Sequence, residues 1–481
     1  MKNKKILALT LAAIIASGSV SQTAIQVYAD DESPMAESSS TVKSSPALTV
    51  KKFEMSDSFR KRSGEALKYA NEKNLARSTR NQLLFEINND ESKAKLVRYY
   101  GMAESVDIPQ RVCIDGQEYN VTSIGKCAFK NKENLKSVNL PSGIKEIGDA
   151  AFQDCKNLEL IELPNTITKI SAFAFHFCMK LKLTKLPDDL TEIGEHAFDI
   201  CLHLELTELP NAITKIPDYA FCNCTNLKLT KLPDNVTKIG KTAFQHCPNL
   251  KLTKLPDNVE IDDCAFRGCT NLQLTELPNA ITKIPNYAFD DCHSLQLTKL
   301  PDNLTEIGCD AFQGCKNLKL TKLPDNVTTI GSDAFKNCTN LKLTKLPDNV
   351  TEIGAYAFNR CINLELTELP KDIKIIPKYA FQYCPNLKLT KLPDGITKID
   401  QGAFQDCNSL QLTKLPDGVT EIGFKAFHNT NIESIDIPES VIKLDEHAFE
   451  TKSIKEIRLS NTFPWNADTT KYVCGCYSDQ V

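Results

Sequence analysis

The sequence predicts a repeat solenoid, α/β to mainly β, in which about fifteen units of 23 residues stack into a curved rod with a parallel sheet on its concave face. Three observations predict this fold. An Ala-Phe pair recurs at a fixed interval, a cysteine follows most pairs at a fixed distance, and leucines recur between the pairs. One such unit is too small to bury its own apolar face, so neighbouring units must stack and share a continuous core.

The Ala-Phe pair sets the period of the repeat. Successive pairs are 23 residues apart, except for two intervals of 22. A period held over so many units is typical of a solenoid. The phenylalanine stands at fifteen positions: Phe129, Phe152, Phe175, Phe198, Phe221, Phe244, Phe266, Phe289, Phe312, Phe335, Phe358, Phe381, Phe404, Phe427 and Phe449.

Each unit begins with an apolar segment, which reads LKLTKLP at residues 341–347. Alternation over its first four residues predicts a short strand, with Leu341 and Leu343 facing the core and Lys342 and Thr344 facing solvent. The proline that closes the segment has no N–H to offer a β-ladder, so it ends the strand.

The rest of the unit reads DNVTEIG and then AYAFNRC, at residues 348–361. Turn residues open a second short extended piece that runs through Val350 and Ile353. The last piece predicts one helical turn, with Ala357, Phe358 and Cys361 directed at the core. In three units a proline replaces the glycine between these pieces: Pro217, Pro285 and Pro377.

This pattern resembles the BspA-like, or treponemal, class of leucine-rich repeat. Residues 135–158, LKSVNLPSGIKEIGDAAFQDCKNL, fit the Pro, Ile-Gly, Ala-Phe and Cys positions of that class, and the resemblance covers residues 121–460. One departure is that most units read L-x-L-T-x-L-P, with the second apolar residue at i+2 where the family has it at i+3. The resemblance implies a secreted or surface-displayed protein, because family members act as adhesins and immune-visible antigens.

The two ends of the chain differ from the repeats. Residues 1–29 combine a basic start, an apolar run and an A-x-A-like site, which predicts a signal peptide. A membrane anchor is the alternative, but the apolar run is shorter than the roughly 20 residues that a spanning helix needs. Residues 30–50 are rich in Ser, Pro and acidic residues and predict a disordered linker.

Three further segments complete the predicted organisation. Residues 51–120 predict an N-terminal cap, with a short helix within 51–80 and a β-hairpin within 83–101. The solenoid follows over residues 121–460, and residues 461–481 are a C-terminal tail. The formal charge of −4, or −7 without residues 1–29, argues against a nucleic-acid partner, because such proteins show a strongly basic face.

Most cysteines fall at one phase of the repeat, three residues after the phenylalanine. Residues at one phase stack, so these thiols predict an internal ladder in which each fills space and bonds a backbone carbonyl of the next turn. Disulfides between neighbouring rungs and a zinc site are the alternatives, although a line of equivalent thiols does not converge as four zinc ligands do. The predicted structural ladder is Cys155, Cys178, Cys201, Cys224, Cys247, Cys269, Cys292, Cys315, Cys338, Cys361, Cys384 and Cys407.

Seven cysteines lie off this phase. A disulfide between Cys113 and Cys127 would clip the cap in an exported chain. Cys474 and Cys476 are compatible with a redox pair, a metal-binding pair, a tether or plain exposed thiols. The other three are Cys222, Cys264 and Cys309.

No catalytic motif is present. The chain lacks G-x-S-x-G, a P-loop and H-E-x-x-H, and the spacing of its seven histidines assembles no triad. The sequence therefore predicts no enzyme, no cofactor and no metal site. A thiol-dependent enzyme built on Cys474 and Cys476 is a distant alternative, which Cys474→Ser would test.

The solvent side of the apolar segment carries the candidate binding surface. From Thr184 to Thr413 a threonine stands there in eleven successive units, flanked by Lys or by Glu and Gln. A basic stripe with hydroxyls suits an anionic ligand, whereas the alternative is a solvated face whose alternating charges avoid like-charge stacking. The candidate residues are Lys228, Lys231, Lys251, Lys254, Lys319, Thr321, Lys322, Lys342, Thr344, Lys345, Lys388 and Lys391.

These observations predict a secreted or surface-displayed binding protein, and the family resemblance implies that it adheres to host matrix or cells through the solenoid surface. The expected partner is a host matrix or cell-surface protein, or an anionic glycan. A structural spacer or envelope component without a defined ligand is the alternative. A second set of candidate contacts is aromatic: Tyr219, Tyr287, Tyr356, Tyr379 and Tyr383.

Overall fold

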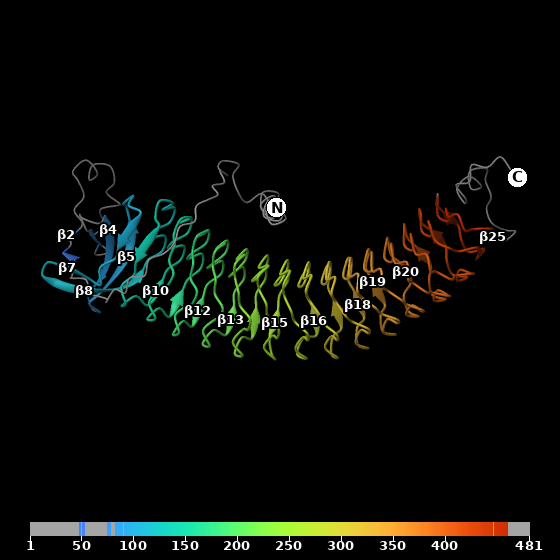
Figure 1. Ribbon diagram of the computed structural model, residues 1–481, viewed down its shortest axis with the longest axis horizontal. Helices are drawn as coiled ribbons and strands as arrows, with labels where there is room; N and C mark the ends of the chain where they lie inside the picture. The colour runs from blue at the N-terminus through green and yellow to red at the C-terminus, as the bar shows by residue number, and fades with distance from the viewer. Residues whose placement is uncertain are drawn as a thin grey trace, which may run out of the picture. The chain divides into compact units, whose positions relative to one another are not determined.

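The computed structural model describes residues 48–49, 51–52, 75–77, 82–89, 91–445 and 447–459. All of them belong to one compact unit, Ser45–Val481. Within it the chain winds into a β-solenoid of about 16 turns of about 23 residues, so the predicted fold class is confirmed. The array of turns bends along its length (Figure 1). The predicted signal peptide, most of the linker and the C-terminal tail lie outside the described residues.

Longer strands precede the first repeated turn. β4 (Leu83–Asn88) and β5 (Lys93–Tyr99) form an antiparallel hairpin, and β7 (Arg111–Ile114) and β8 (Gln117–Ile124) form a second one. β5 and β8 pair in parallel, which joins the two hairpins into one sheet. β8 then pairs in parallel with the first repeated strand, so this sheet continues directly into the solenoid.

Three short strands extend the edge of that sheet. β1 (Leu48–Thr49) pairs in parallel with β7, while β2 (Lys51–Lys52) pairs with β3 (Leu75–Arg77), and β3 pairs with β4. β1 lies within the predicted linker, and β2 and β3 lie within residues 51–80, where the sequence predicted a short helix. The remainder of both segments lies outside the described residues.

The repeated strands are two residues long and come from the second piece of each unit, the Thr-Glu-Ile segment. They pair in parallel and in register with strands of adjacent turns, as Glu306 does with Thr329 and Ile307 with Ile330. They are β10 (Glu146–Ile147), β11 (Lys169–Ile170), β12 (Glu192–Ile193), β13 (Lys215–Ile216), β14 (Lys238–Ile239), β15 (Glu260–Ile261), β16 (Lys283–Ile284), β17 (Glu306–Ile307), β18 (Thr329–Ile330), β19 (Glu352–Ile353), β20 (Ile375–Ile376), β21 (Lys398–Ile399), β22 (Glu421–Ile422) and β24 (Lys443–Leu444).

This sheet is interrupted at three places, before β13, before β16 and before β20. Each of these strands is followed by a proline: Pro217, Pro285 or Pro377. In the other turns the residue at that position donates its N–H to the preceding turn, as Gly308 does to the carbonyl of Ile284 at 2.9 Å. Because proline has no N–H, the ladder loses this bond and the sheet breaks there.

The first piece of the unit forms strands only where its second apolar residue stands at i+3. These strands are β6 (Ser105–Asp107), β9 (Ser137–Asn139), β23 (Ser434–Ile437) and β25 (Glu456–Leu459), which pair in parallel as β6 with β9 and β23 with β25. In the L-x-L-T units the segment keeps only one or two backbone bonds to the preceding turn, for example from Lys388 N to Leu366 O at 2.9 Å. The predicted sheet of L-x-L-T strands was therefore wrong.

The physical reason lies in the order of buried and exposed side chains. Leu343 is buried, but Thr344 and Lys345 are both exposed before the next buried leucine. Two successive outward side chains break the period of two that a strand requires. In β9 the buried residue is Val138, one position later than its L-x-L-T counterpart, and alternation with its neighbours is kept.

The predicted helical turn around the Ala-Phe pair was also wrong. Residues two before and two after the phenylalanine adopt left-handed backbone conformations, as Tyr356 (φ 57°) and Arg360 (φ 60°) do beside Phe358. Their N–H groups, and that of the phenylalanine, donate to the following turn, for example Phe358 N to Ala380 O at 2.8 Å. The alternate N–H groups donate three residues back along the chain, as Asn359 N does to Tyr356 O at 2.9 Å, so the segment is a series of tight turns and has no continuous i→i−4 bonding.

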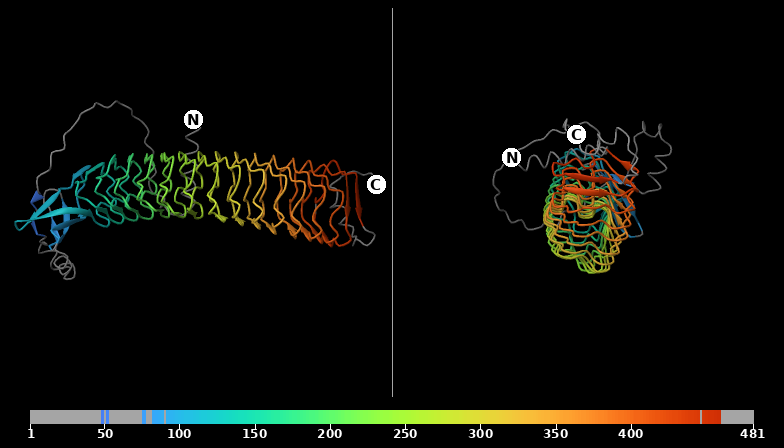
Figure 2. Two further views of the ribbon diagram at one scale, coloured as in Figure 1. Left: turned by 90° about the horizontal axis from the view of Figure 1, so that it is seen from below. Right: turned by 90° about the vertical axis from the view of Figure 1, so that its right-hand side faces the viewer.

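The core runs the length of the solenoid and is built of columns, each made of one repeat position. The fifteen phenylalanine rings stack face to face, with centroids 5.0 to 5.7 Å apart between successive turns. The end-on view in Figure 2 shows successive turns following the same path. A side chain therefore meets the side chains at its own phase in the turns before and after it.

Candidate functional site

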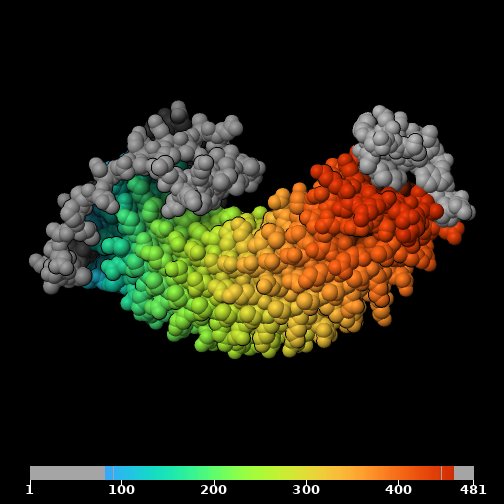
Figure 3. All heavy atoms as spheres, turned by 45° about the vertical axis from the view of Figure 1, so that its right-hand side comes forward, coloured from blue at the N-terminus to red at the C-terminus, as the bar shows by residue number. Residues whose placement is uncertain are grey.

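The candidate lysine and threonine surface is exposed along its whole length. All twelve candidate residues, from Lys228 to Lys391, are exposed. Figure 3 shows one face of the array, on which each turn borders its neighbours in sequence. Charges at one phase of successive turns therefore lie beside one another.

Several of these lysines are neutralised by glutamates of an adjacent turn. Lys228 Nζ lies 2.8 Å from Glu205, and Lys388 Nζ lies 2.7 Å from Glu365. Lys345 Nζ lies 3.1 Å from a glutamate of the following turn, Glu368. These pairs are exposed, so solvent screens them and each adds little to stability. They do reduce the positive charge that the surface offers to a ligand.

The aspartate of the L-P-D segment neutralises others within the same turn. Lys254 Nζ lies 3.1 Å from Asp257, and Lys345 Nζ lies 3.1 Å from Asp348. The hydrogen bond to Asp257 raises the pKa of Lys254 above its ordinary value. Among the described residues, the candidate lysines that form no ion pair are Lys231, Lys251, Lys319, Lys322, Lys342 and Lys391.

The strongest concentration of unpaired charge lies on two adjacent turns. Lys319 and Lys322 stand on one turn, and Lys342 and Lys345 stand at the same phases of the next. We call these four residues the lysine rungs. Only Lys345 is ion-paired within the described chain, while Lys319 donates to Gln296 Oε1 at 3.2 Å. Thr321 and Thr344 lie between the lysines of each turn and are exposed.

The candidate tyrosines lie at the left-handed positions that flank the phenylalanine column. Tyr356 and Tyr379 contact each other, with ring centroids 4.9 Å apart. Arg360 covers the ring of Tyr383 at 4.9 Å, and Tyr383 is 40% exposed. The tyrosines therefore make contacts within the solenoid and keep part of their surface toward solvent.

The twelve ladder cysteines form a single buried column, and all are 0% exposed. Each thiol donates to the carbonyl oxygen of the phenylalanine in the preceding turn, over 2.9 to 3.1 Å. The sequence predicted an acceptor on the next turn, and this was wrong, because the acceptor lies on the preceding turn. Burial raises the pKa of Cys155 and of Cys269 to about 12, so these thiols stay protonated at neutral pH.

All seventeen cysteines within the described residues are free. Cys113 and Cys127, for which the sequence left a disulfide open, are therefore not bonded to each other, and both side chains are partly exposed. Cys264 and Cys309 are also partly exposed, whereas Cys222 is buried. Cys474 and Cys476 lie outside the described residues.

The residue directly after each phenylalanine forms another column, which carries polar side chains. Arg267 Nε donates to Asp290 Oδ2 at 2.9 Å, and Gln313 Nε2 donates to Asp290 Oδ1 at 3.2 Å. Asp290 is 1% exposed, and burial raises its pKa to about 6. Further along, Asn359 donates to Gln382 at 2.8 Å. We call this set, which runs from Gln153 to Glu450, the polar column.

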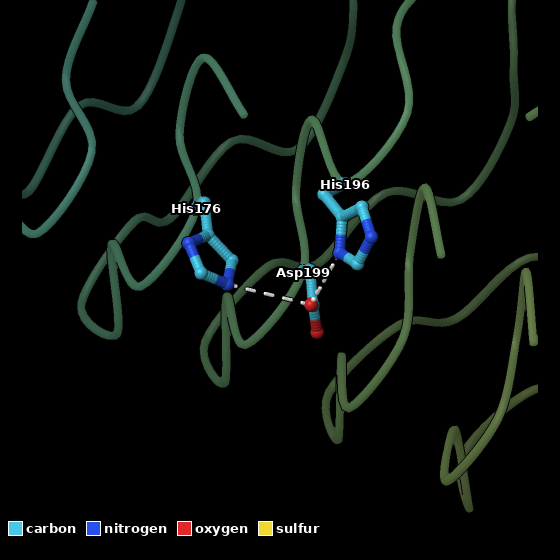
Figure 4. Close-up of side chains that lie close together, drawn as sticks. All are labelled: His176, His196 and Asp199. Carbon is cyan, nitrogen blue, oxygen red and sulfur yellow. Dashed lines mark hydrogen bonds and ion pairs between the residues drawn. The ribbon is translucent and has the colours of Figure 1, made fainter. Parts of the chain in front are cut away.

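Three ionisable residues converge in the polar column near its start. Asp199 Oδ2 lies 2.9 Å from His196 Nδ1 and 3.4 Å from His176 Nε2 (Figure 4). Although burial alone would raise it, hydrogen bonds from His176 and His196 hold the pKa of Asp199 below its ordinary value. Asp199 Oδ1 is buried without a hydrogen-bond partner among the described residues.

Sequence reasoning missed this cluster because it compared histidines with one another and not with the other residues of their columns. His176 and Asp199 both follow a phenylalanine, on successive turns, and His196 stands two residues before the phenylalanine of the Asp199 turn. Aligning all units at the phenylalanine would have placed the three side chains together.

The part of the chain that the structure describes contains no helix long and apolar enough to cross a membrane.

The comparisons with known proteins agree on the repeat class. The family model of the BspA type leucine-rich repeat region matches residues 116–228, 145–273, 193–319, 259–388 and 374–466. A leucine-rich repeat protein from Bacteroides ovatus is 24% identical and has a TM-score of 0.56, with 79% of this chain and 98% of that one covered. At this identity the likeness supports the fold alone. No curated protein matches the chain.

Two further solved structures align with the chain at lower TM-scores. A leucine-rich cell surface protein from Faecalibacterium prausnitzii is 25% identical with a TM-score of 0.48, and covers 83% of this chain and 98% of that one. The pneumococcal vaccine antigen PcpA is 18% identical with a TM-score of 0.48, and covers 81% and 99%. The repeat matches together span residues 116–466, and the chain therefore belongs to the BspA-type leucine-rich repeat family.

Proposed function

We propose that the protein is a secreted or surface-displayed binding protein that adheres to host matrix or cells, and that the lysine rungs contact an anionic partner. The family is one of repeat scaffolds, and such solenoids typically bind through an extended surface and not through a catalytic pocket. The signal-peptide pattern of residues 1–29 supports export.

The observation that carries the proposal is the adjacency of like charges. Lys319 and Lys342 stand at one phase of two neighbouring turns, and Lys322 and Lys345 stand at another, so like charges at the same phase repel each other. If solubility were the only role of this face, we would expect a glutamate on the turn next to each lysine, as Glu365 lies next to Lys388. A bound anionic group would remove the repulsion between the two turns, which is a source of affinity.

The chemistry of the surface favours a repetitive anionic partner, such as a sulfated or acidic glycan or an acidic protein segment. The candidate residues are lysines and threonines, with no aromatic side chain among them. Lysine is a point charge with no fixed fork geometry, so it selects charge density more than shape. Threonine hydroxyls add short-range hydrogen bonds to the same groups.

Solid-phase binding to a panel of matrix proteins and anionic glycans tests the proposal, with the chain from Asp30 to Val481, at low and at physiological salt. Saturable binding at physiological salt should fall at least about tenfold when the four lysine rungs are changed to glutamate, because each charge reversal replaces attraction by repulsion.

The matched control changes four exposed lysines outside the lysine rungs to glutamate: Lys180, Lys316, Lys371 and Lys374. This variant alters net charge equally and should keep its binding. Equal losses in both variants would mean that only net charge matters, and would reject the lysine rungs as the site.

The alternative function is a spacer or envelope component without a defined ligand. The ion pairs Lys228–Glu205 and Lys388–Glu365 favour it, because they neutralise part of the candidate surface internally. Weak binding of equal strength to every panel member, lost at physiological salt, would favour this function over adhesion.

A further inference from the structure

The cluster of His176, His196 and Asp199 has the geometry of a metal site. At a tetrahedral zinc ion with ligand distances of about 2.0 Å, neighbouring ligand atoms lie about 3.3 Å apart. Asp199 Oδ2 is 2.9 Å from His196 Nδ1 and 3.4 Å from His176 Nε2, and all three ligand atoms lie within 4.8 Å of one another. Among the described residues, no other group of three such side chains converges in this way.

The donor set matches the preference of one class of ion. Two imidazole nitrogens and one carboxylate oxygen are the ligands of zinc sites that keep a fourth position for water. We propose that His176, His196 and Asp199 bind one divalent transition-metal ion of the zinc class, with water at the fourth position.

Burial and orphaned charge support a cation at this position. The Asp199 side chain is 9% exposed, while those of His176 and His196 are 15% and 25% exposed, so the cluster can still be reached from solvent. The second carboxylate oxygen of Asp199 is buried without an N–H or O–H donor among the described residues, and the neighbouring Cys222 thiol is only a weak donor, so the desolvation of this oxygen remains unfavourable. A divalent cation between the three side chains offsets this cost.

The two imidazole rings are held in place by their neighbours. His196 lies in a stack between Phe173 and Tyr219, with ring centroids 4.6 and 4.3 Å away. Phe177 meets the edge of His176 at 4.5 Å. Little side-chain freedom is therefore lost when a metal binds.

Gln153 supports the site from the preceding turn of the polar column. Its amide nitrogen lies 3.2 Å from His176 Nδ1. If His176 binds the metal through Nε2, its ring proton is on Nδ1. Rotating the Gln153 side-chain amide by half a turn then lets its oxygen accept a hydrogen bond from Nδ1–H. A metal-binding histidine is normally oriented in this manner by an acceptor at its other nitrogen.

The same residue types recur at the same repeat positions near the other end of the solenoid. Glu450 Oε2 lies 3.4 Å from His428 Nε2 and 3.1 Å from His447 Nδ1. Its carboxylate is 38% exposed, and the three ligand atoms do not converge as those of the first cluster do. This second group supplies a matched control, because identical substitutions can be made at equivalent positions.

The test is titration of Zn²⁺ into the metal-free full chain, followed by calorimetry in a non-chelating buffer with a reducing agent. We expect one tight site per chain. His176→Gln and Asp199→Asn should each abolish it, His428→Gln should leave it unchanged, and Gln153→Ala should weaken it about tenfold. His196→Asn provides a variant that tolerates the left-handed backbone at this position (φ 54°).

Two readouts exclude the nineteen cysteines as the ligands. Co²⁺ in place of Zn²⁺ should give visible absorption of tetrahedral intensity without a sulfur-to-cobalt charge-transfer band. Because the metal joins His176 of one turn to His196 and Asp199 of the next, Zn²⁺ should also raise the melting temperature of the parent chain and not that of His176→Gln. Unchanged binding in His176→Gln and Asp199→Asn, loss of binding in His428→Gln, or a sulfur band would overturn the proposal.

Discussion

At the scale of single residues, the sequence predicted burial correctly and hydrogen bonding only in part. Leu341, Leu343 and Cys361 are all 0% exposed, as the periodicity requires. The direction of the thiol bond to the preceding turn did not follow from composition or spacing, because it depends on which carbonyl the left-handed residues leave available.

The thiol bond gives a first prediction. Cys338 is fully buried and donates to Phe312 O at 3.0 Å, so Cys338→Ala removes a hydrogen bond and leaves a small void. We expect a loss of about 1 to 2 kcal/mol in the free energy of unfolding. Cys338→Ser should lose less, because its hydroxyl can still donate. Urea denaturation measures the effect.

The off-ladder Cys309 is the control, since it is partly exposed. Cys309→Ala should change stability by less than Cys338→Ala. Equal effects of alanine at both positions would show that the ladder thiols add nothing beyond ordinary packing.

A second prediction concerns the pH dependence of stability. Burial raises the pKa of Asp290 from 3.8 to about 6, so the folded state binds a proton there more readily than the unfolded state. The stabilising contribution is present below pH 4 and is lost as the pH rises through about 6, by an amount on the order of 3 kcal/mol. Asp290→Asn should remove this part of the dependence, which melting temperatures from pH 4 to 7 would reveal.

The neighbouring Asp291 is a control of opposite sign. A hydrogen bond from His293 lowers the pKa of Asp291, so its contribution is present at neutral pH and is lost on acidification. Asp291→Asn should therefore lower stability near neutrality, and it should flatten the change at pH 4 to 6 only in part, because burial raises the pKa of Asp290 more than the charge of Asp291 does. If Asp290→Asn leaves the profile of the parent unaltered, the buried carboxyl does not titrate in this range.

At the scale of elements, the sequence located the three pieces of the unit and assigned two of them to the wrong structure. The first piece lost its strand because Thr344 and Lys345 both point to solvent. The last piece is not a helix, because Tyr356 and Arg360 are left-handed and direct their N–H groups to the next turn. Local patterns did not reveal either outcome, since both depend on bonds between residues one full turn apart.

A third prediction concerns the breaks in the parallel sheet. Pro285→Ser would restore an N–H opposite Ile261 O, as Ser171 already bonds Ile147 O at 2.8 Å. The new bond gains about 1 kcal/mol, but loss of the proline restraint on the unfolded chain offsets most of it. We therefore expect little change in melting temperature and slower hydrogen exchange of the backbone around residue 285.

Pro385→Ser is the comparison, because that proline lies at another phase of the repeat and not after a sheet strand. Exchange should stay unchanged there. Faster or equal exchange around residue 285 in Pro285→Ser would mean that the proline does not cause the break.

At the scale of the whole molecule, the period and the family pattern were sufficient to predict the solenoid. The candidate metal cluster could be predicted only by comparing residues at equivalent positions of successive turns. The fold tolerates changes in the number of turns if each column stays continuous. Deleting residues 322–344 joins Thr321 to Lys345 and removes one complete 23-residue turn in phase.

This deletion gives a fourth prediction. The shortened chain should fold with an unchanged circular dichroism spectrum per residue and a length reduced by about 5 Å in small-angle scattering. It should also bind an anionic partner less tightly, since the lysine rungs shrink to one turn. An out-of-phase deletion of residues 322–333 should prevent folding, and equal behaviour of both deletions would contradict the column description.

The equivalence of the turns has a consequence for how such a protein changes over generations. Because the phenylalanine, cysteine and leucine columns place the same side chains in every turn, unequal crossing-over between repeats within the gene yields a chain that still folds. Turns with exposed lysines and turns with exposed glutamates can then be gained, lost or reordered as complete repeat units. The exposed charge pattern can therefore diversify while the core is inherited intact.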